Sequence, residues 1–449
     1  MTSLLGGGRD GHSAASFEAC PGGAVESVRF NGPGDSATCA RVREASVFDQ
    51  VRGLPRVYWY LWVGQLINRV GGFVVPFLTL YLTQELKLSL PQAATVVSLY
   101  GVGGMLAGPV GGLLADKLGR KVTLVGALVS SAACMVGLGF AKDPYTIGAL
   151  ALSIGFTTDT YRPAIFAIVA DLLPPEDRLR AYAHLYWASN LGFSIAPVVA
   201  GLLANRGYFA LFMGDAATTF AFAVLAMFKI PETLGMGQGN EPAPRRGWKD
   251  LARAFTDPVF MSLLVVTFPL AVIFFQFQVT LPAEMMEHGA TPAQFGMTMA
   301  INGLLIVILQ PFALGRLKRY RRSRTLATAS ILVGAGFGLN AFFQLPWQYA
   351  FGVAIWTLGE IAHAPVTSSL VADLAPADAR GRYQGAYFMV WALASSAAPL
   401  LGGWLHDPLG PWFWGMCFVA SIVIAAAHLG IAEMRRERLE ALRGVPVKD

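Results

Sequence analysis

Two pairs of ionisable residues lie inside long apolar stretches of the chain. Asp159 and Arg162 are three positions apart, and so are Glu360 and His363. Side chains at this spacing share one face of a helix, so each pair can act as a unit. Ionisable groups in membrane-spanning helices are costly and mark ion or proton pathways. The pattern therefore predicts groups that bind and release protons. For Asp159 and Arg162, a fixed structural pair or a substrate contact is the alternative.

Arg69 lies in a further apolar stretch, shortly after Gln65 and Asn68. We interpret five residues as a proton-coupling group in a central cavity, namely Arg69, Asp159, Arg162, Glu360 and His363. The expected substrate-binding surface consists of polar and aromatic residues in other apolar stretches: Gln65, Asn68, Trp187, Asn190, Gln276, Gln278, Asn302, Tyr387 and Trp391. The aromatic residues can instead face lipid or pack in the core, and Asn190 and Asn302 can instead join helices by hydrogen bonds. A cavity with few charges suits a moderately hydrophobic organic solute better than a phosphate ester.

The elements that carry these residues follow from composition and from runs of apolar residues. Of the 449 residues, 54% are hydrophobic and 14% are charged, whereas soluble domains carry about 25% charged residues. A spanning helix needs about 20 mostly apolar residues, and lipid satisfies backbone groups only within helices or closed barrels. The sequence predicts an all-α membrane protein with twelve transmembrane helices, over residues 57–83, 91–115, 122–141, 145–172, 181–204, 208–230, 258–283, 293–315, 324–343, 347–374, 383–405 and 411–432.

Positive charge alternates between successive loops. The loops after the second, fourth, sixth, eighth and tenth predicted helices are rich in Lys and Arg, as in residues 316–324, and the loops between them carry few or none. Positive loops stay on the cytoplasmic side. We therefore expect a multi-pass protein of the cell membrane, with both termini in the cytoplasm. The net charge of +6 gathers in loops rather than on one face, which does not indicate nucleic-acid binding.

The second half of the chain repeats the first half at a constant offset. Asp373 follows Asp171 by 202 positions (373 − 171 = 202), and Pro399 follows Pro197 by the same interval. Paired halves of this kind build a transport path at their interface. The sequence thus predicts two pseudo-symmetric six-helix bundles, residues 55–230 and 258–433. The remaining segments are expected to be a disordered N-terminal tail, a cytoplasmic linker and a cytoplasmic C-terminal tail, over residues 1–54, 231–257 and 434–449.

The loop after the second predicted helix carries the motif Gly112-Leu-Leu-Ala-Asp116-Lys-Leu-Gly119-Arg120-Lys121. At every fixed position it is similar to the cytoplasmic signature of the major facilitator superfamily, Gly-x-x-x-Asp-Arg/Lys-x-Gly-Arg-Arg/Lys. Residues 55–435 resemble this family of transporters, and most of all its twelve-helix drug:proton antiporter branch. The resemblance implies a cytoplasmic gate formed by Gly112, Asp116, Gly119, Arg120, Lys121 and Asp171.

Within that gate, the resemblance implies two contacts. Asp116 can interact with the positive N-terminal end of a helix that starts near Arg382. Arg120 can pair with Asp171 at the inner end of the fourth predicted helix. The second half has lost the motif, since Lys318 stands 202 positions after Asp116 (318 − 116 = 202).

The fifth predicted helix contains small residues around a proline, in the order Gly192-Phe-Ser-Ile-Ala-Pro197-Val-Val-Ala-Gly201. This segment resembles the family's antiporter motif, Gly-x-x-x-Gly-Pro-x-x-Gly-Gly, with alanine at two of the glycine positions. Small residues allow close packing, and proline permits a kink. Pro399 and Gly403 repeat the pattern in the eleventh helix, so the motif indicates helix packing as well as antiport.

These patterns predict a secondary transporter and not an enzyme. The sequence contains no His-Glu-x-x-His, Gly-x-Ser-x-Gly or P-loop motif, and its four cysteines lack metal-ligand spacing. We expect a monomer, without cofactor or metal, that couples protons to the export of a small organic compound. Proton-coupled uptake of a peptide or sugar is the alternative, because Gln65-x-x-Asn68-Arg69 resembles the Glu-x-x-Glu-Arg motif of peptide symporters with both glutamates replaced. A sensor with a transporter fold is a further alternative.

The expected mechanism depends on two carboxylates at matching depth in the two halves, Asp159 and Glu360 (360 − 159 = 201). By resemblance, Arg162 corresponds to the arginine of the fourth helix that is proposed to couple protons in the antiporters. Protonation of Asp159 or Glu360 would break a pair with Arg162 or Arg69. The loss of that pair would shift the equilibrium between inward-open and outward-open states.

Overall fold

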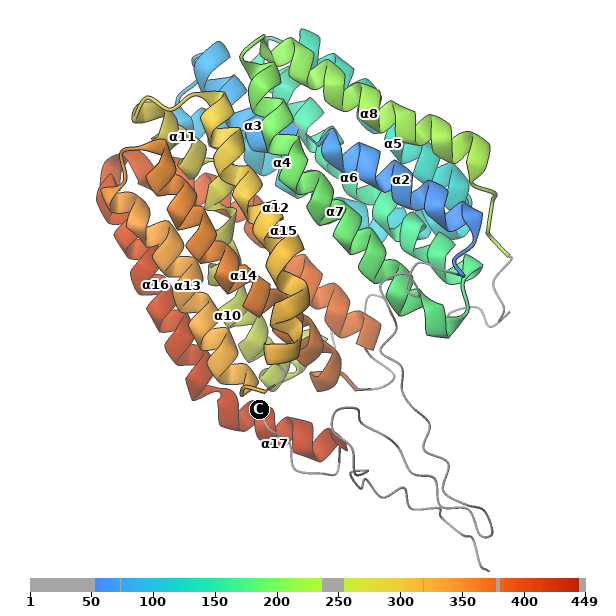
Figure 1. Cartoon of the computed structure of the whole chain (residues 1–449), viewed down its shortest axis with the longest axis vertical. Coiled ribbons are helices and arrows are strands. Elements are labelled where there is room, and N and C mark those ends of the chain that lie inside the picture. Colours follow the sequence, from blue (N-terminus) through green and yellow to red (C-terminus); the bar gives the residue numbers. More distant parts are fainter. Residues whose placement is uncertain (1–52, 73, 236–253, 318, 377–379, 444–449) are drawn as a thin grey trace, which may run out of the picture. The chain divides into compact units, whose positions relative to one another are not determined.

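The computed structural model describes residues 53–72, 74–235, 254–317, 319–376 and 380–443 (Figure 1). The predicted N-terminal tail and the middle of the predicted linker therefore lie outside the described residues, apart from residues 53 and 54 of the tail. Among the described residues every regular element is helical, which confirms the predicted all-α class.

The first half of the chain contains seven α-helices and one π-helical turn among its described residues. In chain order these are α2 (Arg56–Val70), α3 (Val74–Leu80), η1 (Tyr81–Glu85), α4 (Leu90–Lys117), α5 (Arg120–Phe140), α6 (Pro144–Leu172), α7 (Pro175–Ala204) and α8 (Tyr208–Lys229).

The second half contains eight α-helices and two 3-10 turns among its described residues. They are α10 (Pro258–Phe274), η2 (Phe275–Gln278), α11 (Thr280–Glu287), α12 (Pro292–Leu317), α13 (Arg322–Gly338), η3 (Leu339–Phe342), α14 (Pro346–Leu374), α15 (Arg380–Leu409), α16 (Pro411–Gly430) and α17 (Ala432–Arg443). The last of these, α17, was not predicted from the sequence.

Each of the twelve predicted segments coincides with a helix or with a helix that is interrupted once. In the described part of the chain, nine helices are long and apolar enough to cross a membrane. The other three predicted segments, 57–83, 145–172 and 347–374, coincide with α2, α3 and η1, with α6, and with α14. All three carry polar residues that were predicted for the site, and the first is divided into shorter helices.

Two helices are interrupted inside the predicted spans, and polar side chains satisfy the freed backbone groups. At the break between α2 and α3, the Val74 amide donates to Asp215 Oδ2 at 3.0 Å. At η2, the Gln278 carbonyl accepts a hydrogen bond of 2.7 Å from Thr79 Oγ1. Backbone groups in lipid must find partners inside the protein, so the buried carboxylate of Asp215 has a structural role at this break.

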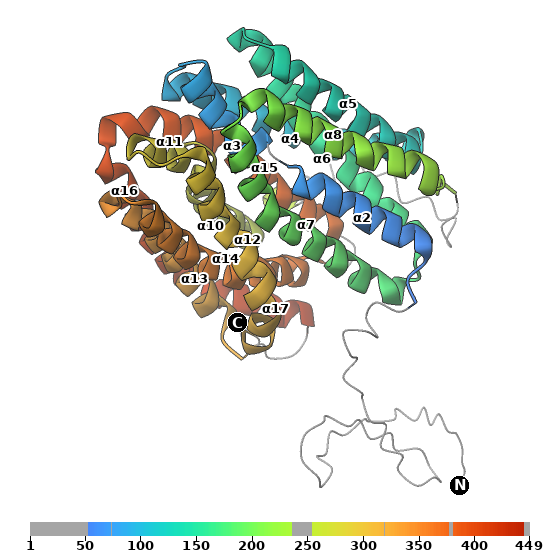
Figure 2. The same cartoon turned by 45° about the horizontal axis from the view of Figure 1, so that its top comes forward.

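The two halves of the chain pack through two helix pairs, α4 with α15 and α7 with α12 (Figure 2). Glycine makes the approach close. A Cβ atom at Gly296 of α12 would lie 2.0 Å from the Pro197 carbonyl oxygen of α7, and a Cβ at Gly303 would lie 2.6 Å from the Ser194 amide. Only a residue without a side chain fits at such a distance.

Contact between α4 and α15 is confined to one end of the pair. On α4, Gly101 and Gly108 are seven residues apart and lie on one face. A Cβ at Gly101 would lie 2.7 Å from Ser396 Oγ of α15, whereas a Cβ at Gly108 would meet no atom within 4 Å. Gly112 of α4 and Gly385 of α15 have open space as well.

The closed end of the pair lies towards the start of α4. A Cβ at Gly403 of α15 would lie 2.3 Å from the Ala94 Cβ of α4. The halves therefore touch near the loops around residues 86–89 and 410, and they separate towards the opposite loops.

The close approach at Gly296 generates a prediction. The variant Gly296→Ala should lower the melting temperature of the purified protein, because the backbone oxygen of Pro197 cannot move aside as a side chain would. Overpacking of this kind costs about 1–3 kcal/mol. Gly415→Ala is the matched control, since a Cβ at Gly415 meets no atom within 4 Å. Equal melting temperatures for the two variants would contradict the packing described here.

Candidate functional site

The predicted ion pair in α6 is present. Arg162 Nε lies 3.0 Å from Asp159 Oδ1, and their side chains are 50% and 30% exposed although both residues lie in the middle of a 29-residue helix. Gly104 of α4 leaves room for the carboxylate, because a Cβ there would lie 2.8 Å from Asp159 Oδ2. The carboxylate–guanidinium pair is therefore partly exposed at mid-span, and proton exchange requires such exposure to water.

Two further residues lie close to this pair. The Tyr100 hydroxyl of α4 interacts electrostatically with Asp159, Arg162 and Arg69. Arg69 of α2 lies against α7, where a Cβ at Gly192 would be 2.4 Å from the Arg69 Cβ. Arg69 Nε is buried and has no hydrogen-bond acceptor among the described residues. Arg69, which the sequence predicted for this group, thus provides a second positive charge near Tyr100, a residue that was not predicted.

In the second half, Glu360 of α14 is bound by an amide and not by an arginine. Asn302 Nδ2 of α12 donates to Glu360 Oε2 at 2.7 Å and also to Thr357 Oγ1 at 3.1 Å. The Tyr186 hydroxyl of α7, in the first half of the chain, lies within electrostatic range of Glu360. The expected pairing of Glu360 with Arg162 or Arg69 is therefore wrong for this structure. A neutral donor stabilises the carboxylate less than an arginine would.

His363 is not brought together with Glu360, although both lie on α14. The His363 ring nitrogen Nε2 contacts Thr367 Oγ1 at 3.2 Å, and its ring lies 6.5 Å from the rings of Trp391 and His428. The side chain is 4% exposed. The expectation that Glu360 and His363 act as one unit is not supported, because helical spacing alone does not determine which neighbours each side chain meets.

The asparagine and glutamine of α2 join helices. Tyr161 donates to Asn68 Oδ1 at 3.0 Å, and Asn68 Nδ2 donates to Thr219 Oγ1 at 2.9 Å. Gln65 Nε2 donates to Ser189 Oγ of α7 at 3.2 Å. The Asn68 amide is thus occupied by α6 and α8, so it joins these helices to α2, a role that was not predicted for it.

The glutamines of η2 are also structural. Gln276 Nε2 donates to the Ala398 carbonyl of α15 at 3.2 Å, and Thr280 donates to Gln276 Oε1 at 3.0 Å. Gln278 is buried, and its carbonyl is the acceptor for Thr79. These contacts hold the interruption between α10 and α11 in place, so the expected substrate contacts at Gln276 and Gln278 are not seen.

Aromatic residues gather in both halves of the chain. Trp391 contacts the rings of Phe274, Phe275 and Tyr387 in the second half. In the first half, Trp187 is 43% exposed and stacks on Trp62 at 6.3 Å. Of the predicted aromatic residues, Trp187 is thus the one with an open face.

The predicted Asn190 is used within its own helix. Its Nδ2 donates to the Tyr186 carbonyl of α7 at 2.9 Å. Tyr186 itself, which the sequence analysis missed, is exposed to a similar extent as Trp187. Two consecutive aromatic residues of α7 are therefore exposed near the predicted Asn190.

The predicted gate motif forms an ion-pair network at the end of α4. Arg120 Nη1 lies 2.7 Å from Asp116 Oδ1, and Arg120 Nε lies 3.5 Å from Asp171 Oδ2. The predicted contact between Arg120 and Asp171 is therefore present. The expected contact of Asp116 with the start of α15 involves the neighbourhood of residues 377–379, which lie outside the described residues.

Glu232 also belongs to this network and was not predicted from the sequence. We call the group of Asp116, Arg120, Asp171 and Glu232 the first corner. The Glu232 carboxylate accepts hydrogen bonds from the backbone amides of Arg120, Lys121, Thr233 and Leu234, at 2.8–3.1 Å. Burial raises the pKa of Glu232, but these four amides together outweigh it and lower the pKa below its ordinary value. The carboxylate also caps the positive N-terminal end of α5.

Two contacts beside Glu232 show why the gate motif needs glycine at position 119 and how Asp171 is held in place. Gly119 has a φ of +112°, which favours glycine, and a Cβ at Gly119 would lie 2.4 Å from Glu232 Oε2. Thr233 Oγ1 donates to Asp171 Oδ2 at 2.9 Å. A glutamate shortly after a long apolar helix is a weak signal in sequence, because two of its partners are backbone groups more than 100 positions away.

The second half retains part of the gate motif, contrary to the sequence analysis. Arg322 Nη1 lies 2.7 Å from Asp373 Oδ2. These residues follow Arg120 and Asp171 by 202 positions each (322 − 120 = 202; 373 − 171 = 202). The aspartate of the motif is lost at position 318, but the arginine–aspartate pair is kept.

The predicted packing motif lies at contacts between helices. Gly192 faces Arg69, Pro197 meets Gly296, and Gly201 approaches the backbone of α12 at Pro292 and Ala293. In the second half, Gly403 of α15 approaches Ala94, in the same helix as Pro399. Close helix contact thus accounts for these residues without a transport role.

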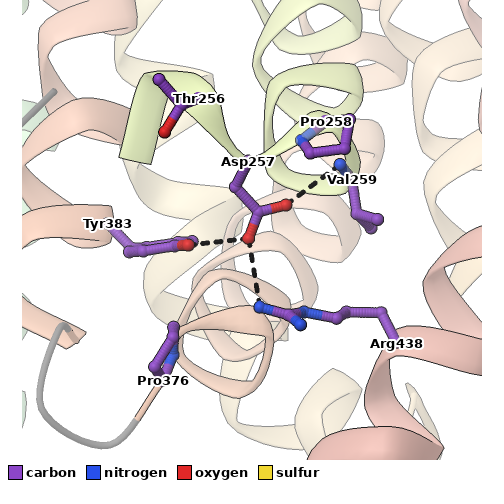
Figure 3. A pocket seen from close by; sticks show the side chains of 7 residues that line it. All are labelled: Thr256, Asp257, Pro258, Val259, Pro376, Tyr383 and Arg438. Atoms are coloured by element: carbon purple, nitrogen blue, oxygen red, sulfur yellow. Dashed lines mark hydrogen bonds and ion pairs between the residues drawn. The ribbon is translucent and has the colours of Figure 1, made fainter. Parts of the chain in front are cut away.

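A cavity of about 300 Å³ lies at the start of α10 and is bordered by the unpredicted helix α17 (Figure 3). Asp257 caps α10 by accepting from the amides of Val259 and Phe260. Its other oxygen accepts from Tyr383 of α15 at 2.7 Å and from Arg438 of α17 at 3.3 Å (Figure 3). These polar groups meet at one carboxylate that ties three helices together, so we interpret this place as a structural junction.

The fold and these groups define a helical membrane transporter, and comparison with known proteins identifies its family. Residues 61–285 and 277–448 match the model of the Major Facilitator Superfamily. The chain belongs to the Major Facilitator Superfamily, and it is a multi-pass membrane transporter and not an enzyme.

Relatives in other organisms include transporters of several kinds. The chain is 26% identical to the uncharacterized MFS-type transporter YhjO of Bacillus subtilis, over 77% of this chain and 86% of that protein. It is 24% identical to a Na(+), Li(+), K(+)/H(+) antiporter of Planococcus maritimus, over 81% of this chain and 92% of the relative. It is 23% identical to the multidrug resistance protein MdtH of Escherichia coli, over 81% of this chain and 91% of the relative.

Solved structures confirm the fold. A peptide transporter POT in complex with sulfate superposes with a TM-score of 0.73 at 19% identity, covering 86% of this chain and 96% of that one. A variant of the nucleoside transporter NupG gives a TM-score of 0.73 at 15% identity, covering 84% of this chain and 100% of the other. The predicted transporter fold is therefore confirmed.

The lowered pKa of Glu232 generates a prediction about stability against pH. A group whose pKa is lower in the folded state stabilises the fold above its ordinary pKa, and this stabilisation is lost as pH falls towards the lowered value. Glu232→Gln should lower the melting temperature at pH 7, by an amount typical of a lost helix cap, about 1 kcal/mol. The difference from the unchanged protein should shrink as the pH falls below the ordinary glutamate pKa.

Glu437→Gln is the matched control, because Glu437 is exposed on α17. A thermal unfolding series between about pH 7 and about pH 4 spans the ordinary glutamate pKa and compares the three proteins. A melting temperature of Glu232→Gln that equals that of the unchanged protein at neutral pH would contradict the capping role of Glu232.

Proposed function

We propose that the protein exports a small, moderately hydrophobic organic compound in exchange for protons, by alternating access between its two halves. The observation that carries this proposal is the partly exposed Asp159–Arg162 pair at mid-span. Relatives that are named a cation/proton antiporter and a multidrug resistance protein agree with it. The open faces of Trp187 and Tyr186 suit an apolar or aromatic solute.

Protonation of Asp159 is the proposed coupling step. The neutral acid no longer holds Arg162 by charge, and Arg69 already supplies a second positive charge near Tyr100. Two arginines without a countercharge disfavour the present arrangement of the halves. A membrane potential contributes about 2.3 kcal/mol per elementary charge per 100 mV, which is enough to bias states that differ by a few kcal/mol.

Glu360 is the proposed second proton acceptor, on the other side of the interface. Its hydrogen-bond partner Asn302 is neutral, and the Tyr186 hydroxyl of the first half lies within electrostatic range. Protonation of Glu360 would therefore change the charge that the first half meets at the interface. A protonated carboxyl can donate to a substrate, whereas the carboxylate only accepts.

The contact pattern between α4 and α15 supports an assignment of the state. The halves touch near residues 86–89 and 410 and separate at Gly112 and Gly385. The separated end carries the arginine-rich loops, which the positive-inside rule assigns to the cytoplasm. We therefore assign this structure to an inward-open state. We propose further that the protein lies in the plasma membrane with both termini in the cytoplasm and that it acts as a monomer.

Proton-coupled uptake of a peptide or sugar is the alternative function. Its sequence support was the Gln65-x-x-Asn68-Arg69 segment. In the structure the amides of Gln65 and Asn68 join helices, so neither residue offers a proton-binding group or an open substrate contact. This leaves export as the function that the site favours.

The first functional prediction concerns coupling. In proteoliposomes, Asp159→Asn and Glu360→Gln should each reduce substrate transport driven by a pH gradient by about tenfold, which lies within typical coupling free energies of about 1–3 kcal/mol. Exchange of substrate at equal pH should persist, because it needs the cavity but no proton. Undiminished gradient-driven transport in both variants would refute the coupling role, and loss of exchange in both would indicate a structural pair instead.

The second functional prediction concerns substrate class and direction. A ligand that binds only the folded protein raises its melting temperature. Aromatic organic compounds should raise the melting temperature of the purified protein more than dipeptides or sugars. In inside-out vesicles, an acidified lumen should drive accumulation of the same compounds. Accumulation in right-side-out vesicles under inward proton gradients would favour the uptake alternative.

A further inference from the structure

The two halves place equivalent residues at the cytoplasmic end of the helices, but their charge balance differs. In the first half, Arg120 pairs with Asp116 and Asp171, and Glu232 lies against the amides of Arg120 and Lys121. This corner thus contains three carboxylates around one arginine. In the second half, the arginine–aspartate pair recurs as Arg322 and Asp373. We call the surroundings of this pair the second corner and compare its charges with those of the first.

The sequence positions that correspond to Asp116 and Glu232 carry no carboxylate in the second half, since they are Lys318 and Met434. Met434 stands 202 positions after Glu232 (434 − 232 = 202), and it is followed by Arg435, which is fully buried and donates to Ser323 Oγ at 3.0 Å. The helix α17 therefore fills the place of Glu232 and adds positive charge where the first half has negative charge.

Exposed arginines surround this second corner. Arg316, Arg319, Arg321 and Arg324 are all exposed, within nine residues of chain. None has a carboxylate partner among the described residues. Like charges at such spacing repel one another in water and more strongly near apolar surroundings. We call these four residues the arginine patch.

The arginine patch continues a surface that faces lipid. On α12, Gly296 and Gly303 contact α7, and the exposed apolar residues of the same helix include Leu304, Ile308 and Phe312. Arg316 follows Phe312 by one turn and donates to its carbonyl. Tyr320 is 68% exposed within the patch, and tyrosine is favoured at the membrane–water interface.

We propose that the arginine patch binds the headgroups of anionic phospholipids in the adjacent leaflet. The headgroup phosphates supply the negative charge that Asp116 and Glu232 supply in the first half. Arginine donates two parallel hydrogen bonds to a phosphate, and clusters of basic residues beside a membrane helix bind anionic lipid. The patch is thus a lipid-binding surface that is separate from the substrate path and independent of the transport direction.

The test measures lipid retention by the purified full-length protein in native mass spectrometry, with phosphatidylglycerol and phosphatidylcholine offered in equal amounts. The triple variant Arg319→Gln, Arg321→Gln, Arg324→Gln should retain less phosphatidylglycerol than the unchanged protein. Each charge near an anionic surface contributes about fivefold in affinity, from about 1 kcal/mol per arginine. Retention of phosphatidylcholine should not change.

Two controls separate charge from folding. The triple Arg→Lys variant keeps the charge and should retain most of the phosphatidylglycerol. Lys117→Gln with Lys121→Gln, in the first corner, should have little effect, because that corner carries its own carboxylates. Equal melting temperatures of the variants in phosphatidylcholine nanodiscs show that each has folded.

The proposal is overturned if the Gln variant retains as much phosphatidylglycerol as the unchanged protein. It is also overturned if the unchanged protein retains the two lipids equally, or if millimolar inorganic phosphate displaces phosphatidylglycerol. In the last case the patch would be a site for a soluble anion.

Discussion

The close contact of the two halves at one end only is the constraint on which the rest of the structure depends. Apolar surface gives helices in lipid little reason to associate, so packing of small residues must hold them. Gly296, Gly303 and Gly403 provide this packing between α7 and α12 and between α4 and α15. Because the close contacts between α4 and α15 end partway along both helices, the central ionisable groups lie at the boundary between packed and open regions.

That boundary explains how charged residues are tolerated at mid-span. Asp159 and Arg162 partly neutralise one another and are partly exposed, which avoids the cost of burying a lone charge. Glu360 accepts a hydrogen bond from the amide of Asn302, and a tyrosine of the other half lies within electrostatic range. The two halves therefore share a fold but differ in chemistry, with an ion pair on one side and a carboxyl held by neutral groups on the other. Pseudo-symmetry accounts for the arginine–aspartate pair, which recurs in both halves. It does not extend to Glu232, whose place is taken by α17 in the second half.

The spans and the repeat could be predicted, because apolar length and a constant offset can be read directly from the sequence. The Arg120–Asp171 pair was implied by the resemblance of the loop motif to that of a known family. The roles of Asn68, Gln276 and His363 could not be predicted, because they depend on which helix lies beside each side chain. Glu232 was missed since its partners are backbone amides, which have no sequence signature. The helix α17 was missed since it is polar and begins where the apolar pattern ends.

The most direct measurement is the distance between spin labels at the two ends of the α4–α15 pair, in a variant without the native cysteines. Labels at Leu113 and Met389 report on the open end, and labels at Gln92 and Trp404 report on the closed end. Alternating access coupled to Asp159 predicts that acid pH or substrate shortens the first distance and lengthens the second, and that Asp159→Asn abolishes the response to pH. Two distances that stay constant in a protein that transports would contradict alternating access between these halves.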